Sequence, residues 1–96
     1  MAAVKFAPPA EKYLKKLKDK PLKKLFKSAI DEICDNPDIG EEKTGDLKGV
    51  LTYGFRHNKT DYRIAYTVEN IDDELVVVIL AGTHEGFYEY LKRYLY

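Results

Sequence analysis

The stretch LTYGFRHNKTDYRIAYTV, residues 51–68, contains two runs in which apolar and polar side chains alternate. In residues 51–56 the apolar side chains occupy the odd positions, and in residues 62–68 they occupy the even positions. A period of two is typical of a β-strand with one buried face. Asn58-Lys59-Thr60 separates the two runs and is typical of a hairpin connection. The stretch therefore predicts an antiparallel hairpin in the middle of the chain.

Before this hairpin the apolar residues recur at a helical spacing. Residues 4–7 form a short alternating run that predicts an edge strand, and Pro8-Pro9 then suits the first turn of a helix, where a missing N–H costs nothing. Asp19-Lys20-Pro21 ends this helix, and a second helix starts at Pro21. Asn36-Pro37 stops the second helix, because the residue before a proline is pushed out of helical geometry. We expect the two helices to pack as a hairpin with facing apolar stripes.

The remaining segments complete an α+β pattern. Residues 37–49 carry proline, aspartate and three glycines, and predict a loop. Asn70 to Asp73 predict a turn, and the continuous apolar run over residues 75–80 is typical of a central strand covered on both faces. Thr83 is a candidate cap for a final helix, whose apolar stripe covers residues 87–95. The order strand, two helices, three strands, helix predicts an α+β fold with helices on one face of an antiparallel sheet.

Length and composition predict one soluble domain over residues 1–96. The 96 residues, 45% hydrophobic and 33% charged, suit a globular unit rather than a disordered chain. Cys34 is the only cysteine, so no intrachain disulfide can form, which suits a reducing cytosol. The longest apolar run, residues 75–81, is too short to span a bilayer, and no N-terminal stretch is typical of a signal peptide. We therefore expect a cytoplasmic protein.

The charges balance overall but are unevenly placed. There are 16 basic and 16 acidic residues, and a net charge of zero argues against nonspecific nucleic-acid binding. Lysines crowd the first third of the chain, and an acidic block follows between Asp31 and Asp46. The simplest interpretation is two solvated helix faces.

The sequence predicts neither a metal nor a cofactor. His57 and His84 are the only histidines, and together with one cysteine they complete no recognisable ligand set. The chain also has no glycine-rich phosphate loop and no nucleophile elbow.

Two further segments carry a family resemblance. Leu47-Lys48-Gly49, then Arg56 and the run over residues 61–66, look like the central block of the RelE/ParE toxin superfamily. The ending over residues 81–88 is similar to the C-terminal active-site segment of that family. The element order also matches across nearly the whole chain. The resemblance implies a RelE-like fold, in which an N-terminal strand and a two-helix hairpin pack on an antiparallel sheet that a C-terminal helix completes.

The resemblance also implies an activity and a partner. Such toxins belong to type II toxin–antitoxin systems and typically cleave messenger RNA, often on the ribosome, without a metal. The RNA 2′-OH attacks the neighbouring phosphate, so one group must accept a proton, another must donate one, and cations must offset the charge that builds on the phosphate. A cognate antitoxin holds the toxin in check, in a toxin–antitoxin complex. We therefore expect an mRNA interferase that inhibits translation and growth.

Four residues are the candidate catalytic groups. Arg63 matches the family position for a phosphate-binding arginine, although an arginine on a sheet face is commonly just solvated or ion-paired. His84 matches the histidine used by members that end in Thr-His, where imidazole suits proton transfer near neutral pH. Tyr88, one helical turn beyond His84, can bond the phosphate or stack on a base, or simply pack in the core. His57 is either a second proton-transfer group or a surface residue of the hairpin.

The resemblance suggests substrate contacts as well. His57 and Asp61 keep the spacing of a YafQ-like subgroup. The RelE branch has lysines in the strand before the hairpin, where this chain has Thr52 and Gly54, so a histidine-based mechanism fits better. The candidate substrate-binding residues are Arg56, Lys59, Lys48 and Asp61.

Two other functions fit the same fold. The ParE branch poisons DNA gyrase through protein contacts and needs no acid–base residue, and His84 after Gly82-Thr83 argues against it. The second alternative is a non-catalytic relative that acts as an interaction module, or as a DNA-binding repressor complex with its antitoxin.

Overall fold

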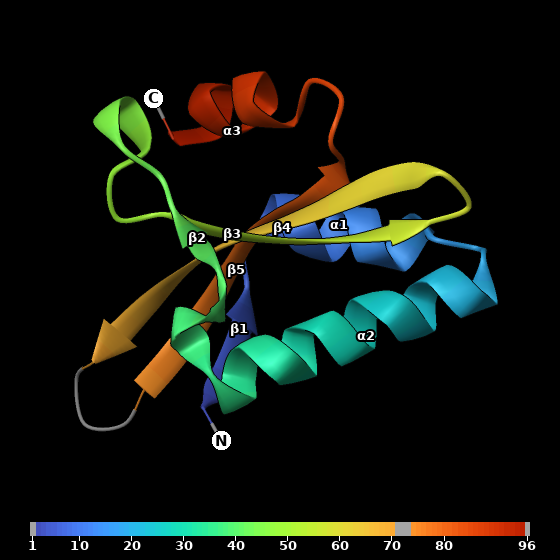
Figure 1. Cartoon of the computed structure of the whole chain (residues 1–96), viewed down its shortest axis with the longest axis horizontal. Coiled ribbons are helices and arrows are strands. Elements are labelled where there is room, and N and C mark those ends of the chain that lie inside the picture. Colours follow the sequence, from blue (N-terminus) through green and yellow to red (C-terminus); the bar gives the residue numbers. More distant parts are fainter. Residues whose placement is uncertain (1, 71–73, 96) are drawn as a thin grey trace.

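The structure is a computed structural model that describes residues 2–70 and 74–95. Five strands form one sheet in the order β1-β5-β4-β3-β2, with β1 parallel to β5 and the other neighbours antiparallel (Figure 1). The predicted α+β class and the predicted order of the main elements are confirmed. In chain order the elements are β1 (Ala3–Phe6), α1 (Pro8–Lys16), α2 (Lys20–Asp35), η1 (Pro37–Ile39), β2 (Glu41–Glu42), η2 (Gly45–Leu47), β3 (Leu51–His57), β4 (Thr60–Asn70), β5 (Glu74–Thr83) and α3 (Phe87–Leu95).

The hairpin of β3 and β4 forms where the sequence predicts it. His57 pairs with Thr60, and the two residues between them, Asn58 and Lys59, have φ angles of 48° and 66°. A two-residue connection with positive φ at both positions matches the twist of the strands that it joins. The turn fixes the register, so Gly54 of β3 lies opposite Arg63 of β4.

A β-bulge in β5 reverses the direction of its side chains. Ala65 of β4 lies opposite Leu80, but the next residue, Tyr66, lies opposite Val78, so Ile79 is an extra residue. One inserted residue moves every later side chain of a strand to the other face. Before the bulge Val78 packs on the α1 and α2 side, and after it Leu80 packs on the α3 side. The apolar run of β5 therefore serves both faces of the sheet.

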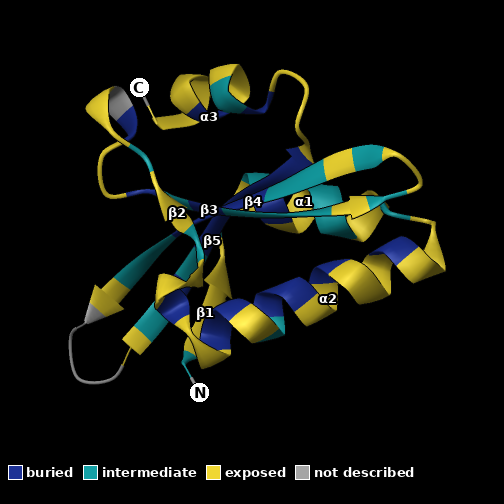
Figure 2. Cartoon of the chain, viewed as in Figure 1, coloured by how far each residue is buried: buried dark blue, intermediate teal, exposed yellow. Residues whose placement is uncertain are grey.

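The two faces carry two separate cores (Figure 2). On one face Phe26 and Ile33 of α2 pack against Ile64 and Tyr66 of β4. On the other face Phe87 and Leu91 of α3 pack with the sheet, and this smaller cluster also includes Leu47, Val50, Ala65, Ile79 and Leu80. The expectation that all helices cover one face is wrong for α3, because the bulge gives β5 an apolar surface on the opposite face as well.

Several boundaries differ from the sequence prediction. Asp19 caps α2 by accepting a hydrogen bond from the Leu22 N–H at 3.2 Å, so the helix starts one residue before Pro21. Thr83, a predicted helix cap, is instead the last residue of β5, and α3 starts only at Phe87. The predicted turn from Asn70 to Asp73 falls largely outside the described residues. Within the described parts of the chain, no helix combines the length and the apolar character needed to cross a membrane.

The segment predicted as a loop, residues 37–49, is tied to the sheet by Tyr66. The buried Tyr66 hydroxyl donates to the Pro37 carbonyl at 2.7 Å and accepts from the Gly40 N–H at 2.9 Å. A Cβ atom at Gly40 would lie only 2.5 Å from this hydroxyl, so the chain passes closely over the ring. Burial raises the pKa of Tyr66, which keeps the hydroxyl protonated as a donor.

We predict that Tyr66→Phe destabilises the fold by about 1–3 kcal/mol, because the Pro37 carbonyl and the Gly40 N–H lose their partner in a buried place. Urea denaturation followed by circular dichroism measures the difference. Tyr94→Phe, at a residue that is 45% exposed, is the matched control and should leave the midpoint unchanged. An unchanged midpoint for Tyr66→Phe would contradict the role given to the hydroxyl.

Candidate active site

Arg63 and His84 meet on the face of the sheet that α3 covers. Arg63 shares this face with Ala65, since both are odd-numbered residues of β4, and its Nε donates to Nδ1 of His84 at 3.4 Å. The imidazole of His84 is exposed, and Arg63 is half-buried. Because Nδ1 accepts this bond, the proton of the neutral imidazole is assigned to Nε2, which stays available to a substrate.

Gly54 makes room for the arginine. A Cβ atom at position 54 would lie 2.6 Å from Nη1 of Arg63 and 2.9 Å from its Cδ. The Arg63 side chain therefore packs closely against the backbone of β3, at a residue without a side chain. This approach fixes Arg63 in the orientation from which it reaches His84.

The backbone of His84 is held on both sides. Its N–H donates to the carbonyl of Asp61 at 2.8 Å, and its carbonyl accepts from the Phe87 N–H at 3.1 Å. The first bond joins the end of β5 to β4, and the second joins it to the first residue of α3. Asp61 thus supports the site through its backbone, while its side chain is exposed.

Tyr88 also contacts the imidazole of His84. The ring centroids of His84 and Tyr88 lie 5.9 Å apart at an interplanar angle of 83°, an edge-to-face contact. The sequence predicts that both residues share one helix face, but His84 precedes α3, so the contact arises from the turn at residues 84–86. Tyr88 is half-buried against the smaller core, so packing and a site role coexist.

Lys43 completes the cluster, and the sequence did not single it out. Its Nζ lies 4.8 Å from the centroid of the Tyr88 ring, and its side chain is only 22% exposed. Its carboxylate neighbour, Glu41, lies at 3.5 Å. Hydrogen bonding to Tyr88 is the main cause that raises the pKa of Lys43, so the ammonium stays charged at neutral pH. We call Arg63, His84, Tyr88 and Lys43 the four-residue cluster.

The candidate substrate-binding residues lie on the hairpin of β3 and β4 and on the segment after η2. Arg56 pairs in register with Asp61, one step farther along the same face as Gly54 and Arg63. Lys59 lies in the hairpin turn beyond them, and Lys48 follows η2, the segment after Lys43. All four candidates, Arg56, Lys59, Lys48 and Asp61, are exposed.

His57 is not brought to the cluster. It continues the odd-numbered series of β3, whose members Tyr53 and Phe55 pack on the α1 and α2 side. Its Nε2 lies 3.8 Å from a carboxylate oxygen of Asp19, in the connection before α2. The structure therefore places His57 on the face opposite His84, and the two-histidine arrangement is not formed.

No metal cluster is found in the described ranges, 2–70 and 74–95. Within them no group of three or more histidine, cysteine, aspartate or glutamate side chains is arranged to hold a metal ion.

Comparison with known families identifies the chain. A family model described as the ParE-like toxin of type II bacterial toxin–antitoxin systems matches residues 4–92. The chain belongs to this toxin family. The resemblance inferred from residues 47–66 and 81–88 is thereby confirmed at the level of the family.

Solved structures show the same fold as this ParE-like toxin. A free-state mutant of the E. coli toxin RelE is 26% identical, with a TM-score of 0.71 over 96% of this chain and 94% of that chain. The toxin is also similar to the intact E. coli RelBE toxin–antitoxin complex, at 25% identity and a TM-score of 0.67 over 85% and 95%. The RelBE2 complex of Mycobacterium tuberculosis matches at 24% identity and a TM-score of 0.65 over 86% and 98%. No curated protein sequence matches the toxin.

We predict that the pKa of Lys43 lies above the usual lysine value and falls toward that value in Tyr88→Phe, which removes the hydroxyl partner. Titration of the lysine Cε resonances by NMR measures both values. Lys48, exposed on the next turn, is the internal control and should titrate equally in the two proteins. Equal Lys43 values with and without the hydroxyl would show that the contact with Tyr88 is absent in solution.

Proposed function

We propose that this toxin is a metal-independent endoribonuclease that cleaves messenger RNA, on the ribosome, and so inhibits translation and growth. The observation that supports the proposal is the contact of 3.4 Å between the Arg63 guanidinium and the His84 imidazole on an accessible face. A cation and a proton carrier at one place are what cleavage by an internal 2′-OH requires.

Each member of the four-residue cluster has a role in this mechanism. The terminal nitrogens of Arg63 bind the non-bridging phosphate oxygens in the bidentate manner that guanidinium favours. The 2′-oxygen attacks phosphorus while its proton leaves to water, and the P–O5′ bond breaks as the imidazolium form of His84 gives its Nε2 proton to the departing 5′-oxygen. His84 is then left as the neutral imidazole, and proton exchange with water restores the tautomer whose Nδ1 accepts from Arg63. The products are a 2′,3′-cyclic phosphate and a 5′-hydroxyl. Lys43 and the Tyr88 hydroxyl offset the charge that builds on the phosphate in the transition state.

The wider assignment follows from the family. Two of the similar solved structures are toxin–antitoxin complexes, which supports a cognate antitoxin that binds this toxin and suppresses it. The proposal places the protein in the cytoplasm, as one RelE-like domain over residues 1–96, without a cofactor. Arg56, Lys59 and Lys48 contribute positive charge along the RNA backbone, and His57 has no assigned role in the reaction.

We predict that His84→Ala and Arg63→Ala each slow RNA cleavage by about 10²–10⁴-fold, because one removes the proton donor and the other a bound cation. Arg63→Lys should not restore the rate, since an ammonium cannot make the bidentate contact. Single-turnover cleavage of RNA and growth after induction measure the effects, and circular dichroism checks the fold.

Lys18→Gln, at an exposed lysine outside the cluster, is the control, and this variant should cleave RNA and inhibit growth as the parent does. Primer extension on a translated messenger should show cuts confined to translated codons. If both cluster variants stay fully toxic, the assignment is wrong, and gyrase-linked DNA breaks in induced cells would instead favour the ParE activity.

We predict that Gly54→Ala lowers cleavage by about 10²-fold, because the added methyl displaces Arg63 by the order of 1 Å. The methyl would also lie 2.9 Å from the Tyr62 carbonyl oxygen, so some loss of stability is expected as well. Thermal unfolding and single-turnover rates separate the two effects. Gly49→Ala, at a glycine with φ of 91° and no neighbour within 4 Å of its Cβ, controls for general strain. A Gly54→Ala variant with the parental rate would contradict the steric role of this glycine.

A further inference from the structure

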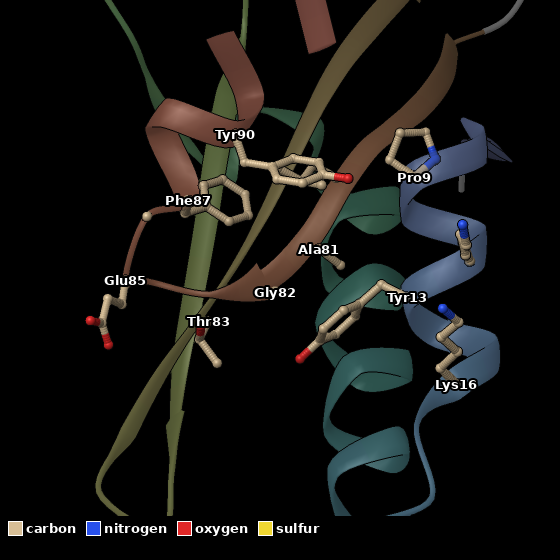
Figure 3. Close-up of a pocket in the computed structure, with 12 residues that line it drawn as sticks. Pro9, Tyr13, Lys16, Ala81, Gly82, Thr83, Glu85, Phe87 and Tyr90 are labelled. Atoms are coloured by element: carbon tan, nitrogen blue, oxygen red, sulfur yellow. The ribbon is translucent and has the colours of Figure 1, made fainter. Parts of the chain in front are cut away.

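A cavity with a volume of about 390 Å³ lies between α1, the end of β5 and the start of α3 (Figure 3). Its size falls in the range of small-ligand sites. Tyr13 projects from α1, and Phe87 and Tyr90 project from α3, so aromatic rings line two opposite walls. Lys12 and Lys16, one helical turn apart on α1, also line it. This cavity is separate from the four-residue cluster, none of whose members lines it.

The floor of the cavity is an open strand edge. β1 pairs with β5 only as far as Val78, whose carbonyl accepts from the Ala7 N–H at 2.8 Å, but β5 continues to Thr83. The backbone of His84 bonds to Asp61 of β4, so by alternation Ala81 and Thr83 turn their N–H and C=O groups to the outer edge. Backbone donors and acceptors therefore lie at the base of the cavity.

The cavity lies beside the proposed cleavage site. Thr83 and Glu85 line it, and they flank His84, whose ring contacts Arg63 and Tyr88 instead. The Cα atoms of consecutive residues are only about 3.8 Å apart. The cavity, lined by Thr83 and Glu85, therefore lies next to the cluster, which contains His84. An RNA strand with its scissile phosphate at His84 can thus place the adjoining nucleotide in the cavity.

The chemistry of the walls favours a nucleotide as the occupant. The rings of Tyr13 and Tyr90 offer stacking surfaces to a base, whereas Phe87 is buried. The outward backbone groups at Ala81 and Thr83 can bond the base edge. Lys12 and Lys16 supply positive charge for its phosphate, and Figure 3 shows the Glu85 carboxylate directed away from Tyr13 and Lys16. Tyr90 is 55% exposed, so its ring is free to stack.

We propose that this cavity is a nucleotide subsite, which takes the base and phosphate of the nucleotide next to the scissile bond. The inference rests on the proposed ribonuclease function. The subsite supplies binding energy and a base preference, and it takes no part in proton transfer.

Two variants test the subsite, Tyr90→Ala and the double variant Lys12→Gln/Lys16→Gln. Their matched controls are Tyr94→Ala, on the same helix and 45% exposed, and Lys15→Gln, which pairs with Glu11 on α1. The probe is a short RNA with a 2′-deoxy residue at the attacking position, so that binding is measured without cleavage. Fluorescence anisotropy gives the affinity, and cleavage of an RNA randomised around the cut gives the base preference.

We expect Tyr90→Ala to weaken binding about 10-fold and to relax the base preference at one position beside the cut. The double lysine variant should lower the slope of log affinity against log salt by about 1 for each lysine removed. The control variants should match the parent, and kcat at saturating RNA should change little.

The outcomes separate the two proposals. If Tyr90→Ala and the double lysine variant bind RNA as the parent does, while His84→Ala abolishes cleavage, the subsite is wrong and the ribonuclease function stands. If these variants keep their RNA affinity but bind the antitoxin more weakly, the cavity is a protein-binding surface and the subsite is again wrong. If the parent neither binds nor cleaves RNA, both proposals fail together.

Discussion

The extra residue at Ile79 is the constraint on which the arrangement of this toxin depends. Because it reverses the direction of the side chains along β5, one strand supplies apolar groups to the helical layer before the bulge and to the α3 core after it. The same reversal sets which backbone groups face β4, so that the His84 N–H bonds to Asp61 and those of Ala81 and Thr83 face the outer edge, which β1 does not cover because it ends at Phe6. The cluster and the cavity thus share one geometric origin.

Local patterns predicted the elements that depend on local physics. The hairpin over residues 51–68 follows from a period of two and a turn at Asn58-Lys59, and α2 follows from its apolar stripe. The face that α3 covers was not predictable in this way. The bulge reverses the side chains of β5, but the run over residues 75–80 is apolar at every position, so no change in the sequence pattern reveals it. The short strand β2 was also missed, since its two glutamates carry no strand pattern.

The same distinction applies to the site. The period of two placed Arg63 opposite the core face, and by the same parity His57 follows Tyr53 and Phe55 onto the helical face. The role of His84 came from the family resemblance rather than from any spacing. Lys43 reaches Tyr88 because its N–H donates to the Val50 carbonyl at 2.9 Å, and because the preceding residues are held by bonds to Tyr66 and by the pairing of β2 with β3. No sequence pattern encodes a contact of that kind.

The close approach at Gly54 has an evolutionary consequence. The guanidinium of Arg63 and any side chain at position 54 compete for one volume, so each excludes the other. A lysine at position 54 and the orientation of Arg63 seen here are therefore mutually exclusive. If a lysine replaced Gly54 in a single step, Arg63 would be displaced from the position in which it contacts His84. An evolutionary path between the two arrangements would therefore include a protein that has the lysine and a displaced Arg63.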